Sequence, residues 1–144
     1  MTNIPRRLFM YWADGFSNAP EVVRLAVRSW EAFNPELELV LLDDTNLTTW
    51  TGNESRIESW NQFDLQKKSD LLRMLLISRH GGFWADSTLV CTRPLDEWLD
   101  FDSPSGVIFL RTQPGKNRFI QSFFLGAEAG SPFILQWLAQ LEKL

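Results

Sequence analysis

Hydrophobic and polar positions follow two patterns that alternate along the chain. Short apolar runs are typical of buried strands, and they occur over residues 6–12, 37–44, 83–92, 106–112 and 119–127, of which 83–92 is interpreted as a strand or as a strand followed by a turn. Apolar residues spaced three and four apart predict helices over residues 19–34, 64–82 and 131–144. The polar residues 45–63 are interpreted as a long loop or short helices, and residues 113–119 as a loop. Strands that alternate with helices predict an α/β protein with a mostly parallel sheet flanked by helices.

Two of the expected helices carry residues suited to their ends. Asp64 is placed to cap the N-terminus of the helix over 64–82, and Gly81 is placed to end it. Ser131 and Pro132 suit the cap and the first position of the last helix. These residues support the two helix assignments.

Acidic residues follow the expected strands. Asp14, Asp43, Asp44 and Asp86 all fall where a strand gives way to a loop. Ligands of open α/β sheets bind at the carboxyl ends of the strands, so these carboxylates are candidates for a binding site. Asp86 has two interpretations at this point: it binds a divalent cation that holds phosphates, or it caps a turn with the hydroxyl residues 87–88.

Composition limits the kinds of partner and metal that the chain can bind. The net charge of −4 over 144 residues argues against a nucleic-acid partner and fits one soluble domain. One cysteine and one histidine exclude an internal disulfide and a zinc site built from those residues, so we expect any metal to be a hard cation bound by oxygens. No apolar run reaches the length of a transmembrane segment, and no signal peptide is apparent. We expect a cytoplasmic protein that can associate peripherally with the inner face of a membrane.

Charged residues on the helix over 64–82 also have two interpretations. Asp70 and Arg73 are three positions apart and share a helix face. They are interpreted either as a surface ion pair or as a pair that binds vicinal hydroxyls of a ligand. Lys67 and Lys68 are interpreted as a solvated face, although a base there can also neutralise a phosphate. His80, at the helix end, is interpreted as structural.

Five segments in order resemble a known family. The stretch "SDLLRMLLISRHGGFWADST" (69–88) is similar to the S-D-x-x-R and D-x-D region of sugar-nucleotide glycosyltransferases, and most similar to the capsular polysaccharide synthesis family. The segments "IPRRLFMYWADG", "SWEAFNPELELVLLDDTN" and "FFLGAEAGSPFI" resemble other parts of that family, and "RPLDEWL" resembles the segment behind the acid. The resemblance covers nearly the whole chain. It implies a GT-A fold, which is a Rossmann-like sheet, in a single domain.

The resemblance also implies a site. It implies that Asp86, Arg73 and Asp70 are the catalytic residues, with the last two contacting the donor sugar. It implies a divalent metal, Mn²⁺ or Mg²⁺, at Asp86 and Thr88. The remaining substrate-binding positions that it implies are Tyr11, Trp12 and Ala13 at the base and ribose, Asp44 on the nucleotide side, and Ser69, Trp84 and Ala85 next to the motifs.

The implied reaction transfers a sugar from a nucleotide-diphosphate donor to a glycan or lipid-linked glycan acceptor. Retention of configuration and a role in bacterial capsular or surface polysaccharide synthesis are expected. Two features depart from the family: Thr88 stands where the second acid of D-x-D belongs, and the chain is about 100 residues shorter than is usual for the fold. The chain is therefore expected to lack part of the acceptor-side half, as a fragment, a minimal member or a degraded one.

Two alternatives to this enzyme stay open at this point. The first is a non-catalytic relative that binds a nucleotide sugar without turning it over. The second is another α/β nucleotide binder such as a nucleotidyltransferase, which the lack of a glycine-rich phosphate loop disfavours.

Overall fold

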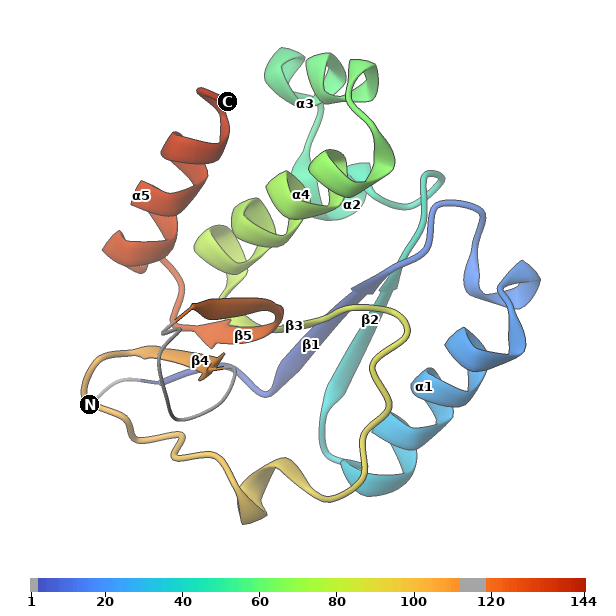
Figure 1. Ribbon diagram of the computed structural model, residues 1–144, viewed down its shortest axis with the longest axis vertical. Coiled ribbons are helices and arrows are strands. Elements are labelled where there is room, and N and C mark those ends of the chain that lie inside the picture. The colour runs from blue at the N-terminus through green and yellow to red at the C-terminus, as the bar shows by residue number, and fades with distance from the viewer. Residues whose placement is uncertain (1–2, 112–118) are drawn as a thin grey trace.

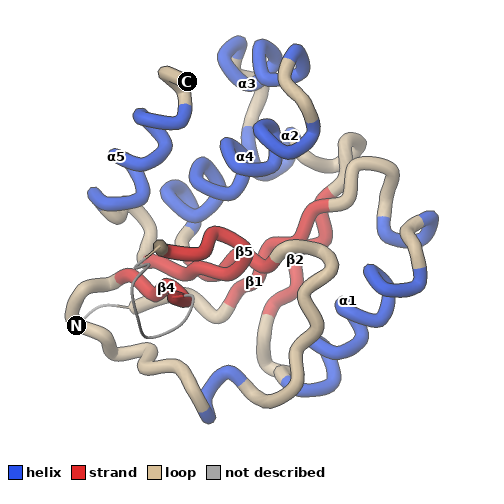
Figure 2. The backbone as a smooth tube through the Cα atoms, viewed as in Figure 1, coloured by secondary structure: helices blue, strands red, loops and turns tan. Residues whose placement is uncertain are grey.

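The fold is a five-stranded sheet with helices on both faces (Figures 1 and 2), in a computed structural model that describes residues 3–111 and 119–144. The strands are β1 (Arg7–Tyr11), β2 (Glu38–Leu42), β3 (Gly82–Ala85), β4 (Val107–Arg111) and β5 (Ile120–Ala127). Their spatial order is β2-β1-β3-β5-β4. β1 pairs in parallel with β2 and β3, whereas β5 pairs antiparallel with β3 and β4. Only β5 therefore runs against the others, and the mostly parallel α/β sheet expected from the sequence is confirmed.

The helices form two layers. They are α1 (Glu21–Phe33), α2 (Thr48–Thr51), α3 (Ser55–Ser59), α4 (Leu65–His80) and α5 (Pro132–Leu141). Figure 1 shows α4 and α5 on one face of the sheet and α1 on the other. The predicted loop over 45–63 contains α2, α3 and a 3-10 turn at Trp60–Gln62, which agrees with the short-helix alternative.

The two layers bury their helices to different extents. α1 buries one stripe, Val23, Ala26 and Trp30, as expected for a helix with solvent on its other side. In α4 every residue from 71 to 78 is buried, because α4 packs against both the sheet and α5. Arg73 lies within this buried stretch, so its charge is held far from bulk water.

A glycine pair connects α4 to β3. Gly82 has φ +101°, and a Cβ there would lie 2.6 Å from the carbonyl oxygen of Arg7. Only glycine fits this close approach, which allows β3 to lie directly beside β1. For residues 83–92 the structure agrees with the alternative of a strand followed by a turn, since β3 ends at Ala85. The chain turns there, and the backbone N–H of Leu89 donates to the carbonyl of Asp86 at 2.8 Å.

The helix ends agree in part with the predictions. The Asp64 carboxylate accepts a hydrogen bond from the backbone N–H of Lys67 at 2.8 Å, so the predicted cap is confirmed. Ser131 occupies the cap position of α5, but its side chain makes no capping hydrogen bond. Residue 112 and most of the predicted loop over 113–119 lie outside the described residues.

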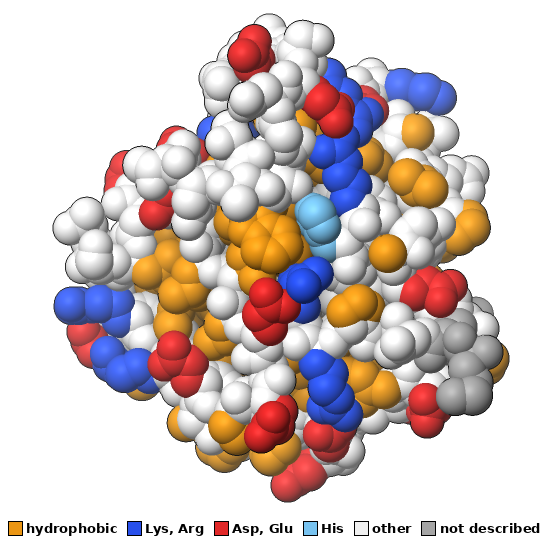
Figure 3. Space-filling model, turned by 180° about the vertical axis from the view of Figure 1, so that it is seen from behind, with side chains coloured by type: hydrophobic (Ala, Val, Ile, Leu, Met, Phe, Trp, Pro, Cys, Tyr) orange, Lys and Arg blue, Asp and Glu red, His pale blue; other side chains and the backbone are white. Residues whose placement is uncertain are grey.

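The far end of α4 has a structural role. His80 Nε2 lies 2.8 Å from the carbonyl oxygen of Trp50, and Arg79 donates to the carbonyl of Thr51 at 2.6 Å. Figure 3 shows the single histidine at the surface beside hydrophobic side chains. These bonds fix α2 against α4, which supports the structural interpretation of His80. Within the described residues, no helix has the length and apolar character needed to span a bilayer.

Candidate functional site: a cavity at the carboxyl ends of the strands

A polar cavity of about 330 Å³ lies at the carboxyl ends of β1 and β3. This strand-end cavity is lined by Tyr11, Gln66, Ser69, Asp70, Arg73, Trp84, Asp86, Ser87, Thr88 and Ser122. A second hollow of about 410 Å³, the adjoining cavity, shares four of these residues and adds Trp12, Ala13, Asp14 and Leu65. The two hollows adjoin each other along these four shared residues.

Arg73 is the centre of the strand-end cavity. Its Nη2 donates to Asp86 Oδ1 at 2.8 Å, and its Nη1 lies 3.3 Å from Asp70 Oδ1. The Arg73 side chain is 5% exposed, whereas those of Asp70 and Asp86 are 35% and 41% exposed. The guanidinium therefore holds two carboxylates whose remaining surface faces the cavity. Asp70, Arg73 and Asp86, which the family resemblance implies as site residues, therefore all line one cavity.

Trp84 donates a second hydrogen bond to Asp86. Its indole N–H donates to the same Oδ1 atom at 2.8 Å, and the Arg73 guanidinium lies 5.1 Å from the indole ring centroid. Among the described residues, Asp86 Oδ2 has no protein donor. The carboxylate does not cap the turn at Ser87 and Thr88, because both of its hydrogen bonds go elsewhere.

Burial shifts the pKa values of this cluster in opposite directions. Burial raises the pKa of Asp70, Arg73 lowers it in part, and Asp86 and Asp64 add to the increase. Burial lowers the pKa of Arg73, and the neighbouring Asp86 and Asp70 oppose that change. The Nε atom of Arg73 is buried without a partner among the described residues, so the guanidinium is held by its two terminal nitrogens alone.

A second polar chain begins at Tyr11. The Tyr11 hydroxyl donates to Asp44 Oδ1 at 2.6 Å, and Lys68 Nζ lies 3.1 Å from the same oxygen. Burial is the main cause that raises the pKa of Tyr11, followed by this hydrogen bond. The Lys68 side chain is only 12% exposed, so the interpretation of Lys68 as part of a solvated face is wrong. Asp44 attracts it inward.

Most predicted site residues line the two hollows, but two do not. Ala85 is fully buried in the core on the α1 face, because successive strand residues point to opposite faces and Trp84 points to the cavity. Asp44 lies behind Tyr11 and lines a separate cavity.

Gln66, Ser87 and Ser122 line the strand-end cavity and were not predicted as site residues. Gln66 shares a helix face with Asp70 and Arg73, so helical spacing could have found it. Ser87 lies inside the motif. Ser122 carries no sequence signal, because only the pairing of β5 with β3 brings it there.

The donor set for a divalent cation is small. Asp86 and Thr88 both line the cavity, and carboxylate and hydroxyl oxygens are ligands of the kind that Mg²⁺ and Mn²⁺ accept. Within the described residues, no group of three or more His, Cys, Asp and Glu side chains is arranged to hold a metal. The site therefore fits a cation only if a bound ligand supplies most of its coordination.

These features define the class of the protein as an α/β protein with a polar cavity at the carboxyl ends of its parallel strands. A solved structure, the PaToxG glycosyltransferase, superposes with a TM-score of 0.67 and 15% identity, covering 94% of this chain and 59% of that one. At that identity the likeness shows the fold alone. It confirms the predicted GT-A-like architecture.

The chain belongs to the family described as capsular polysaccharide synthesis protein, whose family model matches residues 1–143. Two curated relatives are fungal. The O-glycosyltransferase braB of Annulohypoxylon truncatum is 24% identical over 96% of this chain, and the glycosyltransferase afumC of Aspergillus fumigatus is 27% identical over 92%. The chain spans 37% and 38% of the lengths of these two relatives. The family resemblance found in the sequence is confirmed.

Proposed function

We propose that this chain is the donor-binding part of a glycosyltransferase, which binds a nucleotide-diphosphate sugar across the strand-end and adjoining cavities. The observation that carries the proposal is the cluster in which Arg73 holds Asp70 and Asp86 at the carboxyl ends of the strands. The glycosyltransferase names of the two curated relatives support it.

The proposed roles of the site residues follow from how far each side chain is exposed to the cavity. Asp70 accepts hydrogen bonds from hydroxyls of the donor sugar, since its carboxylate is fixed by Arg73 and still reaches the cavity. Arg73 is too buried to be the main contact of the sugar, so it acts chiefly by positioning both carboxylates. Trp12 and Ala13, with Tyr11 at the shared wall, border the nucleoside in the adjoining cavity.

The diphosphate requires a positive charge that the described lining does not supply. The charged residues of the two hollows are Asp14, Asp70, Asp86 and Arg73, and Arg73 is already paired with two of the three carboxylates. We therefore include a divalent cation, Mn²⁺ or Mg²⁺, which Asp86 and Thr88 would hold. Such an ion would neutralise charge on the nucleotide-diphosphate leaving group.

Retention of configuration is part of the proposal. The bond between the anomeric carbon and the phosphate oxygen breaks, and the acceptor hydroxyl bonds to that carbon on the same face. The acceptor proton passes to the departing phosphate oxygen. This route needs no protein base, and it is supported by the observation that both carboxylates of the strand-end cavity, Asp70 and Asp86, are already paired with Arg73. The proposed acceptor is a glycan or lipid-linked glycan of a surface polysaccharide. The family description supports that role, but the fungal relatives give no support for a bacterial setting.

Calorimetry tests donor binding. The chain is titrated with UDP-, GDP- and CMP-sugars in the presence of Mn²⁺. We expect saturable binding of a diphosphate donor and none of the CMP-sugar, which carries a single phosphate. If no nucleotide sugar binds, the proposal fails.

A binding-only relative is the second candidate. The observation that favours it is Thr88, a neutral residue at the position of a second acid in the strand-end cavity. Hydrolysis of the bound donor separates the two candidates. Slow release of free sugar with metal present supports the enzyme, and donor binding with no release supports the binding-only protein.

A further inference from the structure

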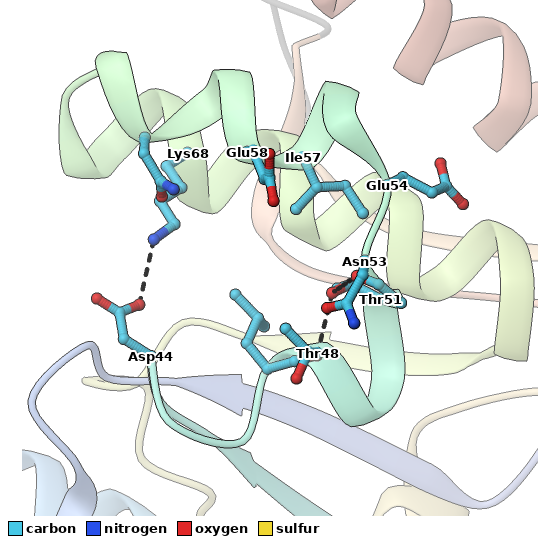
Figure 4. Close-up of a pocket in the computed structure, with 11 residues that line it drawn as sticks. Asp44, Thr48, Thr51, Asn53, Glu54, Ile57, Glu58 and Lys68 are labelled. Carbon is cyan, nitrogen blue, oxygen red and sulfur yellow. Dashed lines mark hydrogen bonds and ion pairs between the residues drawn. The ribbon is translucent and has the colours of Figure 1, made fainter.

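A separate cavity of about 290 Å³ lies beside the start of α4, with Lys68 on its wall (Figure 4). This side cavity is lined by Asp44, Leu47, Thr48, Thr51, Gly52, Asn53, Glu54, Ile57, Glu58, Asn61 and Lys68. It shares no lining residue with the strand-end or adjoining cavity. Its volume is at the lower end of the range for small-molecule sites.

The wall between the side cavity and the strand-end cavity is an ordered polar chain. Asp44 Oδ1 accepts the hydrogen bond of the Tyr11 hydroxyl from one side and pairs with Lys68 Nζ from the other. Figure 4 shows this ion pair at one end of the side cavity. A ligand in the side cavity would therefore lie next to the strand-end cavity without entering it.

The charges of the side cavity disfavour an anion. Lys68 is its only cation among the described lining residues, and Asp44 pairs with it. Glu54 pairs with Arg56 and Arg79 outside the lining, and Glu58 has no ion pair in the described part of the chain. A phosphate would meet unpaired acidic charge, whereas a neutral or amine-bearing ligand would not.

The side cavity is lined by neutral polar side chains with free hydrogen-bonding capacity and by apolar side chains. The side chains of Thr48, Asn53 and Asn61 have no hydrogen-bond partner among the described residues, and Figure 4 shows Thr48 and Asn53 on one side of the cavity. Hydroxyl and amide groups can both donate and accept, as the hydroxyls of a sugar do. Leu47 and Ile57 are largely buried members of the same lining and offer an apolar surface to the C–H face of a ring.

We propose that the side cavity is a second saccharide site, which binds a hydroxylated ring, neutral or amine-bearing, apart from the nucleotide sugar. The site goes beyond the proposed function, since it requires neither a nucleotide nor turnover. A single sugar ring that forms a few hydrogen bonds is expected to bind with a dissociation constant in the millimolar range.

The test is an NMR titration of the ¹⁵N-labelled chain without nucleotide, with glucose, glucosamine and glucuronate as probes. We expect saturable shifts of the Asn53 and Asn61 side-chain amides with the first two sugars and much weaker binding of the anion. Thr48→Val removes one hydroxyl without changing shape and should raise the dissociation constant about threefold or more. Thr49→Val is the matched control, because Thr49 is exposed outside the cavity.

Glu58→Gln provides a second variant. It should weaken glucosamine binding more than glucose binding, because it removes an acidic charge from the wall, and Glu31→Gln on α1 should change neither. The proposal is overturned if neither glucose nor glucosamine gives saturable shifts, if Thr48→Val and Thr49→Val behave alike, or if glucuronate binds as well as glucose. Because no nucleotide is present, failure here leaves donor binding to be judged separately.

Discussion

Arg73 in α4 and Asp86 just beyond β3 are thirteen positions apart and form an ion pair of 2.8 Å at the carboxyl edge of the sheet. The guanidinium is almost fully buried, whereas the carboxylate is 41% exposed. Because α4 packs against the sheet, Arg73 is held in place, and its ion pair fixes the Asp86 carboxylate at the cavity surface. The geometry of the site depends on this contact.

Arg73→Met should destabilise the fold as well as the site. The substitution leaves Asp70 and Asp86 without their shared cation, and we expect a loss of about 1–3 kcal/mol in the free energy of unfolding. The loss is smaller than for a fully buried pair because both carboxylates reach solvent. Urea denaturation measures it. Arg93→Met, at an exposed arginine, should stay within about 0.5 kcal/mol, and equal losses in the two variants would contradict the account.

Trp84→Phe tests the hydrogen bond that Trp84 donates to Asp86. The phenyl ring keeps most of the packing but cannot donate to Asp86 Oδ1, so Asp86 should be less well positioned. We expect a stability loss of about 0.5–1.5 kcal/mol and a several-fold weaker binding of the nucleotide diphosphate. Calorimetry and thermal unfolding measure the two effects. Trp98→Phe is the control, since Trp98 packs on Phe124 away from the cavity, and it should keep the parent affinity.

Tyr11 should make stability depend on alkaline pH. Burial, followed by the hydrogen bond to Asp44, raises the pKa of Tyr11 above its ordinary value of 10.0. The unfolded chain therefore loses this proton at a lower pH than the native protein does, and the free energy of unfolding falls as pH rises above about 10. Tyr11→Phe lacks this contribution.

The measurement compares urea midpoints of the parent and Tyr11→Phe between about pH 8 and about pH 11. The parent should be the more stable at the lower pH by about 0.5–1.5 kcal/mol, from the hydrogen bond to Asp44. That advantage should shrink as the pH rises. A constant difference across the range would show that the Tyr11 pKa is the same in the folded and unfolded states.

Local patterns in the sequence were enough to predict much of the site. Helical spacing placed Asp70 and Arg73 on one face, and Gly81 was predicted to end the helix just before the expected strand. Both inferences depend on residues close in sequence. The structure agrees with both: Asp70 and Arg73 line the same cavity, and α4 ends at Gly81.

Other features depended on pairing between distant segments. The reversed direction of β5, which brings Ser122 to the cavity, follows from its ladder with β3 and has no local signature. The burial of Lys68 depends on Asp44, 24 positions away. The placement of Ala85 was predictable: residues alternate along a strand, so Trp84 and Ala85 could not both face the cavity.

The most direct test of the central claim is the coupling between metal and nucleotide at Asp86. Mn²⁺ should bind weakly to the protein alone, because within the described residues no group of three or more His, Cys, Asp and Glu side chains is arranged to hold a metal. The nucleotide diphosphate should tighten Mn²⁺ binding about tenfold or more, and by linkage Mn²⁺ should tighten the nucleotide equally.

Calorimetry on the parent, Asp86→Asn and the surface control Asp102→Asn measures this coupling, with circular dichroism to show that each variant is folded. The parent and Asp102→Asn should show the full coupling, and Asp86→Asn should bind the nucleotide with an affinity that Mn²⁺ no longer changes. If Asp86→Asn couples metal and nucleotide as strongly as the parent, Asp86 is not the cation ligand and the proposed donor site is wrong.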